Sequence, residues 1–93
     1  MTWKRRQPSS PTKDRETYAS YLRDLGYLVR EAGEQTRTEV ATADTAEDKL
    51  FQEGRRMAHI EVLSLMQQQA EGFGIPLPEL CLDGLDPEND LLT

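Results

Sequence analysis

Residues 45–73 constrain the fold more than any other part of this chain, because their pattern predicts one long helix with more apolar surface than one neighbour can bury. The stretch contains no proline. Thr45 and Asp48 have the spacing of a capping box, in which a hydroxyl and a carboxylate three residues later satisfy the first backbone N–H groups. Gly74 and Pro76 follow as the expected stop signal. We therefore predict a helix over residues 45–73.

The apolar side chains of this helix fall on two sides. One face, expected to pack on another helix, comprises Phe51, Gly54, Ala58, Val62, Leu65 and Phe73. Ile60 and Leu63 lie on the far side, so the helix is apolar nearly all round from Met57 to Met66. Such a helix is usually buried on more than one side. Either a second copy of the chain or the C-terminal segment must cover it, and the candidate interface is Met57, Ile60, Leu63 and Met66.

A first helix is predicted over residues 12–33. Ser10 and Pro11 suit its start. Its apolar residues recur at helical spacing and form one stripe roughly 120° wide at 100° per residue. The members of the stripe are Tyr18, Tyr21, Leu22, Leu25, Leu28, Val29 and Ala32. Gly33 is a candidate C-terminal cap. Thr36, Val40 and Ala43 continue the periodicity, so the alternative is a helix that runs on, and the connection is placed between residues 33 and 44.

The segment 75–93 is short but rich in leucine. Ile75, Leu77, Leu80, Leu82 and Leu85 supply apolar side chains, and Asp86 with Pro87 suits the start of a helical turn. We expect an all-α fold: an antiparallel two-helix hairpin, with this segment packing back as a helical or extended piece. Two hairpins are expected to dimerise as a four-helix bundle, and a single chain covered by its own C-terminal segment is the rival.

The size of the chain favours association. Its 93 residues allow one domain, assigned to residues 12–93, and only 37% are hydrophobic. Small domains bury a low share of their surface, so association is a common source of stability. A single cysteine excludes an intrachain disulfide. No apolar run suggests a secretory signal or a membrane-spanning helix, so we expect a cytoplasmic protein with no membrane contact.

Charge is divided unevenly between the two ends. Residues 1–15 hold five basic side chains and one acid, a net charge of +4, whereas the other 78 residues carry six basic and sixteen acidic ones, a net charge of −10. Residues 1–11 are expected to form a flexible basic arm. Trp3, Lys4, Arg5 and Arg6 could contact phosphate and stack on bases of a single strand. The acidic remainder opposes nucleic-acid binding.

The residues that could support catalysis or hold a metal do not form a recognisable set. His59 and Glu61 are two residues apart and do not share a helix face, and one histidine with one cysteine is too few for a structural zinc site. Cys81 with His59 lacks a third orienting group. The acidic string from Asp86 to Asp90 fails to match a calcium loop, because Leu91 stands where glycine is required. We expect no catalysis, cofactor, metal or small-molecule ligand.

The sequence therefore favours a helical protein that acts through protein–protein interaction, as a homodimer or as an adaptor subunit bound to another protein. The alternative is a nucleic-acid-associated regulatory protein that uses the basic arm.

Overall fold

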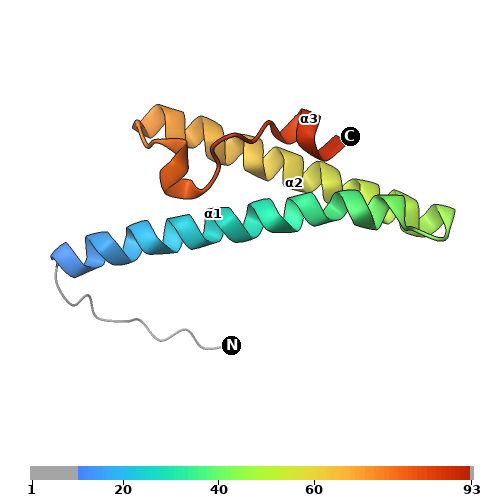
Figure 1. The fold of residues 1–93 in the computed structure, drawn as a ribbon, viewed down its shortest axis with the longest axis horizontal. Coiled ribbons are helices and arrows are strands. Elements are labelled where there is room, and N and C mark those ends of the chain that lie inside the picture. The colour runs from blue at the N-terminus through green and yellow to red at the C-terminus, as the bar shows by residue number, and fades with distance from the viewer. Residues whose placement is uncertain (1–10, 93) are drawn as a thin grey trace.

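The computed structural model describes residues 11–92, with side chains described from residue 14 on, and in that part of the chain all the regular secondary structure is helical. Two long helices, α1 (Pro11–Ala41) and α2 (Ala46–Phe73), run antiparallel and pack against each other (Figure 1). A short 3-10 helix, η1 (Leu77–Leu80), and a final helix, α3 (Pro87–Leu92), follow. Within these residues, no helix combines the length and apolar content needed to cross a membrane.

The ends of α2 follow the sequence signals closely. Thr45 is the N-cap, and its Oγ1 accepts a hydrogen bond from the backbone N–H of Asp48 at 3.0 Å. Gly74 ends the helix in the left-handed conformation with φ 68°, where its N–H donates to the carbonyls of Ala70 and Glu71. Glycine adopts that backbone conformation without the steric cost of a Cβ. The predicted second helix is thus confirmed to within one residue.

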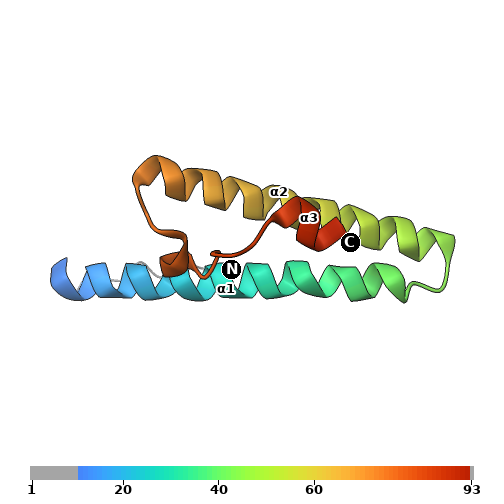
Figure 2. The ribbon, with the colours of Figure 1, turned by 45° about the horizontal axis from the view of Figure 1, so that its top comes forward.

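The C-terminal segment, residues 75–92, folds back over the two long helices. The helices are close together near the turn that joins them and diverge toward the other end, and the segment lies along the side where they diverge (Figure 2). Side chains from both helices hold it. Arg30 Nη1 donates to the carbonyls of Cys81 and Asp83 at 3.0 and 2.9 Å. Gln67 Nε2 donates to those of Leu82 and Leu85 at 3.2 and 2.8 Å.

The core is built by α2 and the C-terminal segment. The buried hydrophobic residues are Ile60, Leu63, Ala70, Leu80, Leu82, Leu85 and Leu91. Three come from α2 and four from the residues after it, whereas α1 supplies only the partly buried Val29. The positions of α1 that are buried are small: Gly26, Gly33 and Thr36. The Thr36 hydroxyl donates to the carbonyl of Gly33, so this buried polar group is satisfied.

Gly26 and Gly33 allow the C-terminal segment to lie directly on α1. A Cβ atom at Gly26 would lie 1.9 Å from the backbone oxygen of Leu80, so any side chain there would displace η1. At Gly33, a Cβ would lie 3.1 Å from side-chain carbons of both Leu63 and Leu91. Gly33 is therefore a packing position inside α1, and the prediction that it caps the helix is wrong.

Two further expectations are corrected. The first helix continues to Ala41, eight residues past Gly33, and the connection shortens to residues 42–45. On α2, the side expected to pack on α1 is exposed, and the side expected to need another cover is buried within the chain. Ile60 and Leu63 are 4% and 0% exposed, whereas Phe51 and Leu65 of the supposed packing face are exposed. The C-terminal segment covers Ile60 and Leu63 because the glycines of α1 leave room for it.

Replacing Gly26 by alanine is expected to destabilise the fold. The methyl group would collide with a backbone oxygen, which cannot rotate away, and overpacking of this kind costs about 1–3 kcal/mol. That exceeds the ~1 kcal/mol that alanine gains over glycine inside a helix. Gly72→Ala is the matched control, because nothing lies within 4 Å of its Cβ position. Thermal unfolding followed by circular dichroism should rank the Gly26 variant below the parent and the Gly72 variant at or above it.

Leu63→Ala should lower the free energy of unfolding by about 2–5 kcal/mol, as truncation of a fully buried leucine does. Its side chain lies between α1, α2 and α3, so the cavity would loosen all three. The measurement is urea unfolding at protein concentrations low enough to keep the chain monomeric. A change below 1 kcal/mol would contradict the placement of Leu63 in a single-chain core.

Candidate interaction surface

The apolar stripe predicted for the first helix is exposed along most of its length. Tyr18, Tyr21 and Leu28 are 65%, 62% and 59% exposed, and Leu22 and Leu25 are more than a third exposed. By helix periodicity, the centre of this stripe lies roughly 60° around α1 from the side formed by Gly26, Gly33 and Thr36. The side of α1 that packs inside the chain is thus distinct from its most hydrophobic side.

The exposed stripe of α2 lies next to that of α1. Phe51, Val62, Leu65 and Phe73 are all exposed, and helix periodicity places them roughly 130° around α2 from the buried Ile60, Leu63 and Ala70. Val29 of α1 and Ala58, His59 and Val62 of α2 line a shallow hollow between the two helices. This hollow joins the two stripes into one surface.

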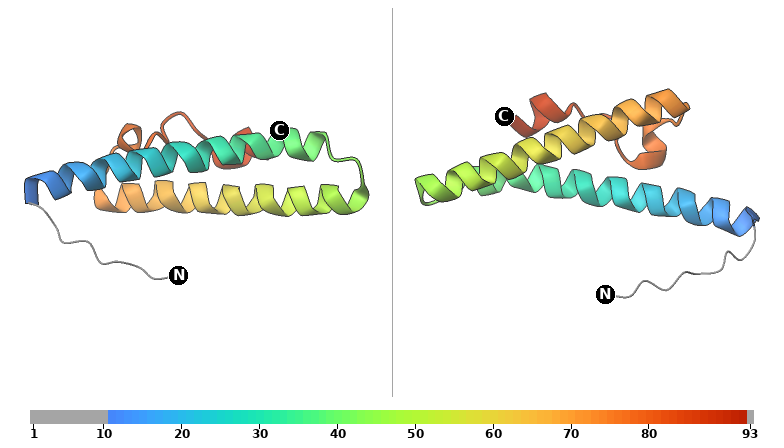
Figure 3. Two further views of the ribbon diagram at one scale, coloured as in Figure 1. Left: turned by 90° about the horizontal axis from the view of Figure 1, so that it is seen from below. Right: turned by 180° about the vertical axis from the view of Figure 1, so that it is seen from behind.

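We call this surface the open face. It comprises Tyr21, Leu25, Leu28 and Val29 of α1, with Phe51, Ala58, Val62 and Leu65 of α2; Tyr18 and Phe73 extend it where the helices diverge. The C-terminal segment packs on the other side of the hairpin: seen from the back, it passes behind α2 and is visible above α2 and in the gap between the two long helices (Figure 3, right). Near the turn, an ion pair between Arg55 and Glu39 links α2 to α1.

The four candidate interface residues differ in burial and in the side of α2 on which they lie. Ile60 and Leu63 are buried within the chain, under the C-terminal segment, and cannot touch a second copy of the folded chain. Met66 is partly buried against the same core. Met57 is 47% exposed but lies on another side of α2 from the open face. Of the four, Ile60 and Leu63 are therefore unavailable to a partner of the folded chain, and Met57 is the most exposed.

The residues considered for catalysis do not meet. His59 Nδ1 lies 2.8 Å from the carbonyl oxygen of Arg55, which can only accept, so Nδ1 carries the proton. Cys81 lines a different hollow with Tyr27, Arg30 and Asp83. Among the described residues, no three side chains of histidine, cysteine, aspartate or glutamate are grouped as metal ligands would be.

The basic arm, with Trp3, Lys4, Arg5 and Arg6, lies outside the described residues. The C-terminal part of the described chain is strongly acidic: residues 71–92 contain six acidic and no basic side chains. Asp86 directly precedes α3, and its carboxylate accepts from the backbone and side-chain nitrogens of Asn89 at 3.4 and 2.7 Å. This is the capped turn expected from the sequence.

Comparison with known proteins adds no functional assignment, because no family model, curated protein or solved structure matches this chain.

Two signals for these surfaces were present in the sequence. Gly26 and Gly33 are seven residues apart, two helical turns, and so mark one side of α1 for close approach. The apolar stripe is offset from that side, so the glycines and the stripe mark two different surfaces of α1.

Tyr27 lies on a third side of α1, away from α2 and from the open face. Its interaction with Glu31 can be tested by titration. A side-chain hydrogen bond to Glu31, together with the negative charge of that carboxylate, raises the pKa of the Tyr27 phenol. Glu31→Gln should therefore lower the pKa of Tyr27 toward its ordinary value. An NMR titration that resolves the individual tyrosines measures it, and an unchanged pKa would show that the two side chains do not interact.

Proposed function

We propose that this chain acts by protein–protein interaction rather than catalysis, and that it forms a homodimer through the open face. The observation that supports the proposal is that both long helices expose their most apolar stripes on the same side of the hairpin, next to each other. Isolated exposed apolar residues are ordinary, whereas a contiguous patch of this kind typically marks an interaction site.

The open face is large enough for a stable interface. Its four aromatic side chains, Tyr18, Tyr21, Phe51 and Phe73, are between 62% and 76% exposed. At about 200 Å² for a whole aromatic side chain, they present on the order of 500 Å². The exposed leucines and Val62 bring the face close to the roughly 800 Å² per partner of a standard interface. Aromatic residues are also enriched where binding energy concentrates.

A second copy is the partner that fits this surface best. Two identical apolar faces are complementary when related by a twofold axis, which is the commonest symmetry of soluble oligomers. Each hairpin would contribute two antiparallel helices, and four helices packed on a shared apolar core form a four-helix bundle. The C-terminal segments would lie on the outside, where each already covers its own hairpin.

Leu65→Glu is the test of this proposal. Leu65 is 57% exposed in the single chain, so the substitution should leave the hairpin folded while placing a charge in the dimer interface. Leu50→Glu is the matched control, because Leu50 is an exposed leucine on the same helix that lies off the open face. Sedimentation equilibrium across a concentration series should give a dimer for the parent and for the Leu50 variant, and a monomer for the Leu65 variant.

A monomeric parent chain at all concentrations would refute homodimerisation. The open face would then have to bind a different protein, as an adaptor subunit does. Equal behaviour of the two variants would instead place the dimer interface elsewhere on the surface.

A further inference from the structure

A second surface, separate from the open face, lies between α2 and the C-terminal segment. It is an open groove of about 660 Å³, and its apolar lining includes Ile75, Leu77, Leu85 and Pro87. Three carboxylates, those of Glu71, Asp86 and Glu88, also line it, and no basic residue does. A groove with apolar walls and an acidic rim fits a segment that combines an aromatic or aliphatic side chain with positive charges.

Within residues 14–92, hydrogen bonds engage one of the three carboxylates on the rim. Asp86 is engaged with Asn89 as the cap of α3. Within residues 14–92, neither Glu71 nor Glu88 has a hydrogen-bonded or ion-paired side-chain partner. Both therefore remain able to pair with cations brought from outside this part of the chain.

We propose that this groove binds residues 3–6 of the same chain, Trp-Lys-Arg-Arg. Residues 1–13 carry four basic side chains and no acid, which makes them the one strongly cationic stretch of the sequence. Trp3 supplies an apolar ring for the groove, and the three cations beside it face Glu71 and Glu88. Docking within one chain needs little intrinsic affinity, because the tether keeps the local concentration high.

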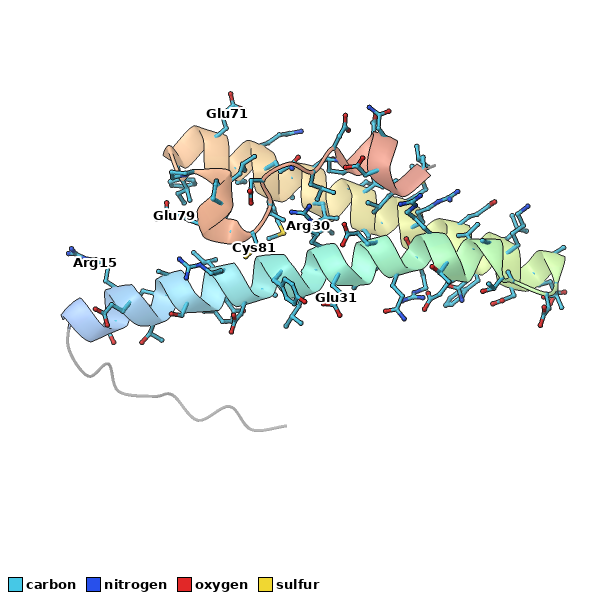
Figure 4. All side chains as sticks on the ribbon, viewed as in Figure 1. Arg15, Arg30, Glu31, Glu71, Glu79 and Cys81 are labelled. Carbon is cyan, nitrogen blue, oxygen red and sulfur yellow. The ribbon has the colours of Figure 1, made fainter. Side chains whose placement is uncertain are left out.

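The number of residues before α1 sets how far residues 3–6 can extend from it. Residues 3–6 precede the start of α1 by five to eight residues, which corresponds to a reach of roughly 17–27 Å in an extended chain. Arg15, near the start of α1, and Glu71 on α2 lie toward the same end of the molecule, where the long helices diverge (Figure 4). The Glu71 end of the groove thus lies toward the end of the hairpin where α1 begins, whereas α3, which supplies Glu88, lies nearer the middle of α2 (Figure 1).

Trp3 is the only tryptophan, so its fluorescence reports directly on docking. In the full-length chain at low salt, we expect a blue-shifted emission and protection from quenching by acrylamide. The double variant Glu71→Gln/Glu88→Gln should lose most of this protection and shift the emission to that of a solvent-exposed tryptophan. Glu47→Gln/Glu61→Gln is the matched control, since it removes two acids of α2 that do not line the groove. Added salt should weaken the protection, because it screens partly exposed charges.

Three outcomes would overturn the proposal. An emission typical of exposed tryptophan in the parent chain would show that the arm does not dock. Protection that grows with protein concentration would assign the groove to the arm of another molecule. Protection lost in the Leu65→Glu variant, but kept when the groove acids are neutralised, would place Trp3 on the open face. The groove variants should leave the solution mass unchanged, so this proposal and homodimerisation fail independently.

Discussion

The structure depends on the close contact between α1 and the C-terminal segment at Gly26 and Gly33. With hydrogen in place of a side chain at these positions, the backbone of η1 and the side chain of Leu91 reach the surface of α1. This allows Leu80, Leu82, Leu85 and Leu91 to complete a core with Ile60 and Leu63. Arg30 and Gln67, one from each long helix, then satisfy four backbone carbonyls of the segment. Two helices of this length could not form such a core alone, because α1 contributes no large buried side chain to it.

The sequence predicted the helical class, both long helices and the fold-back of the C-terminal segment, because these follow from local signals. Thr45, Gly74 and Pro87 mark ends of elements by their own backbone chemistry. The side of each helix that would be buried was predicted wrongly, because the most hydrophobic side was taken as the inner one. That rule fails where a helix is buried through glycine: Gly26 and Gly33 add nothing to an apolar stripe, yet they determine what packs on it. The end of α1 was misplaced for the same reason, since a glycine was interpreted as a cap.

The sequence suggested two possible covers for the apolar surface of α2, the C-terminal segment or a second copy of the chain. The structure separates that surface into two sides of the helix. The C-terminal segment accounts for Ile60 and Leu63, which it covers within one chain. It leaves Phe51, Val62 and Leu65 exposed, and α1 does not cover them either. The sequence indicated that α2 needed more than one cover, but it could not separate an inner from an outer set, because that depends on where the segment crosses the hairpin.

The exposed apolar stripes of α1 and α2 represent hydrophobic stabilisation that the single chain does not use. Each large apolar side chain that leaves water contributes about 1.5–3 kcal/mol, whereas a small domain has a net stability of only about 5–15 kcal/mol. A single chain of this size that leaves the four aromatic rings of the open face and several leucines in water therefore keeps much of its available stabilisation unused. Association through the open face would recover part of it without disturbing the inner core, because the two sets of side chains, which share only Val29, lie on different sides of the same helices. The glycine side of α1 makes this division possible: it lets the C-terminal segment cover one side of the hairpin, so that the more hydrophobic side remains free for a partner.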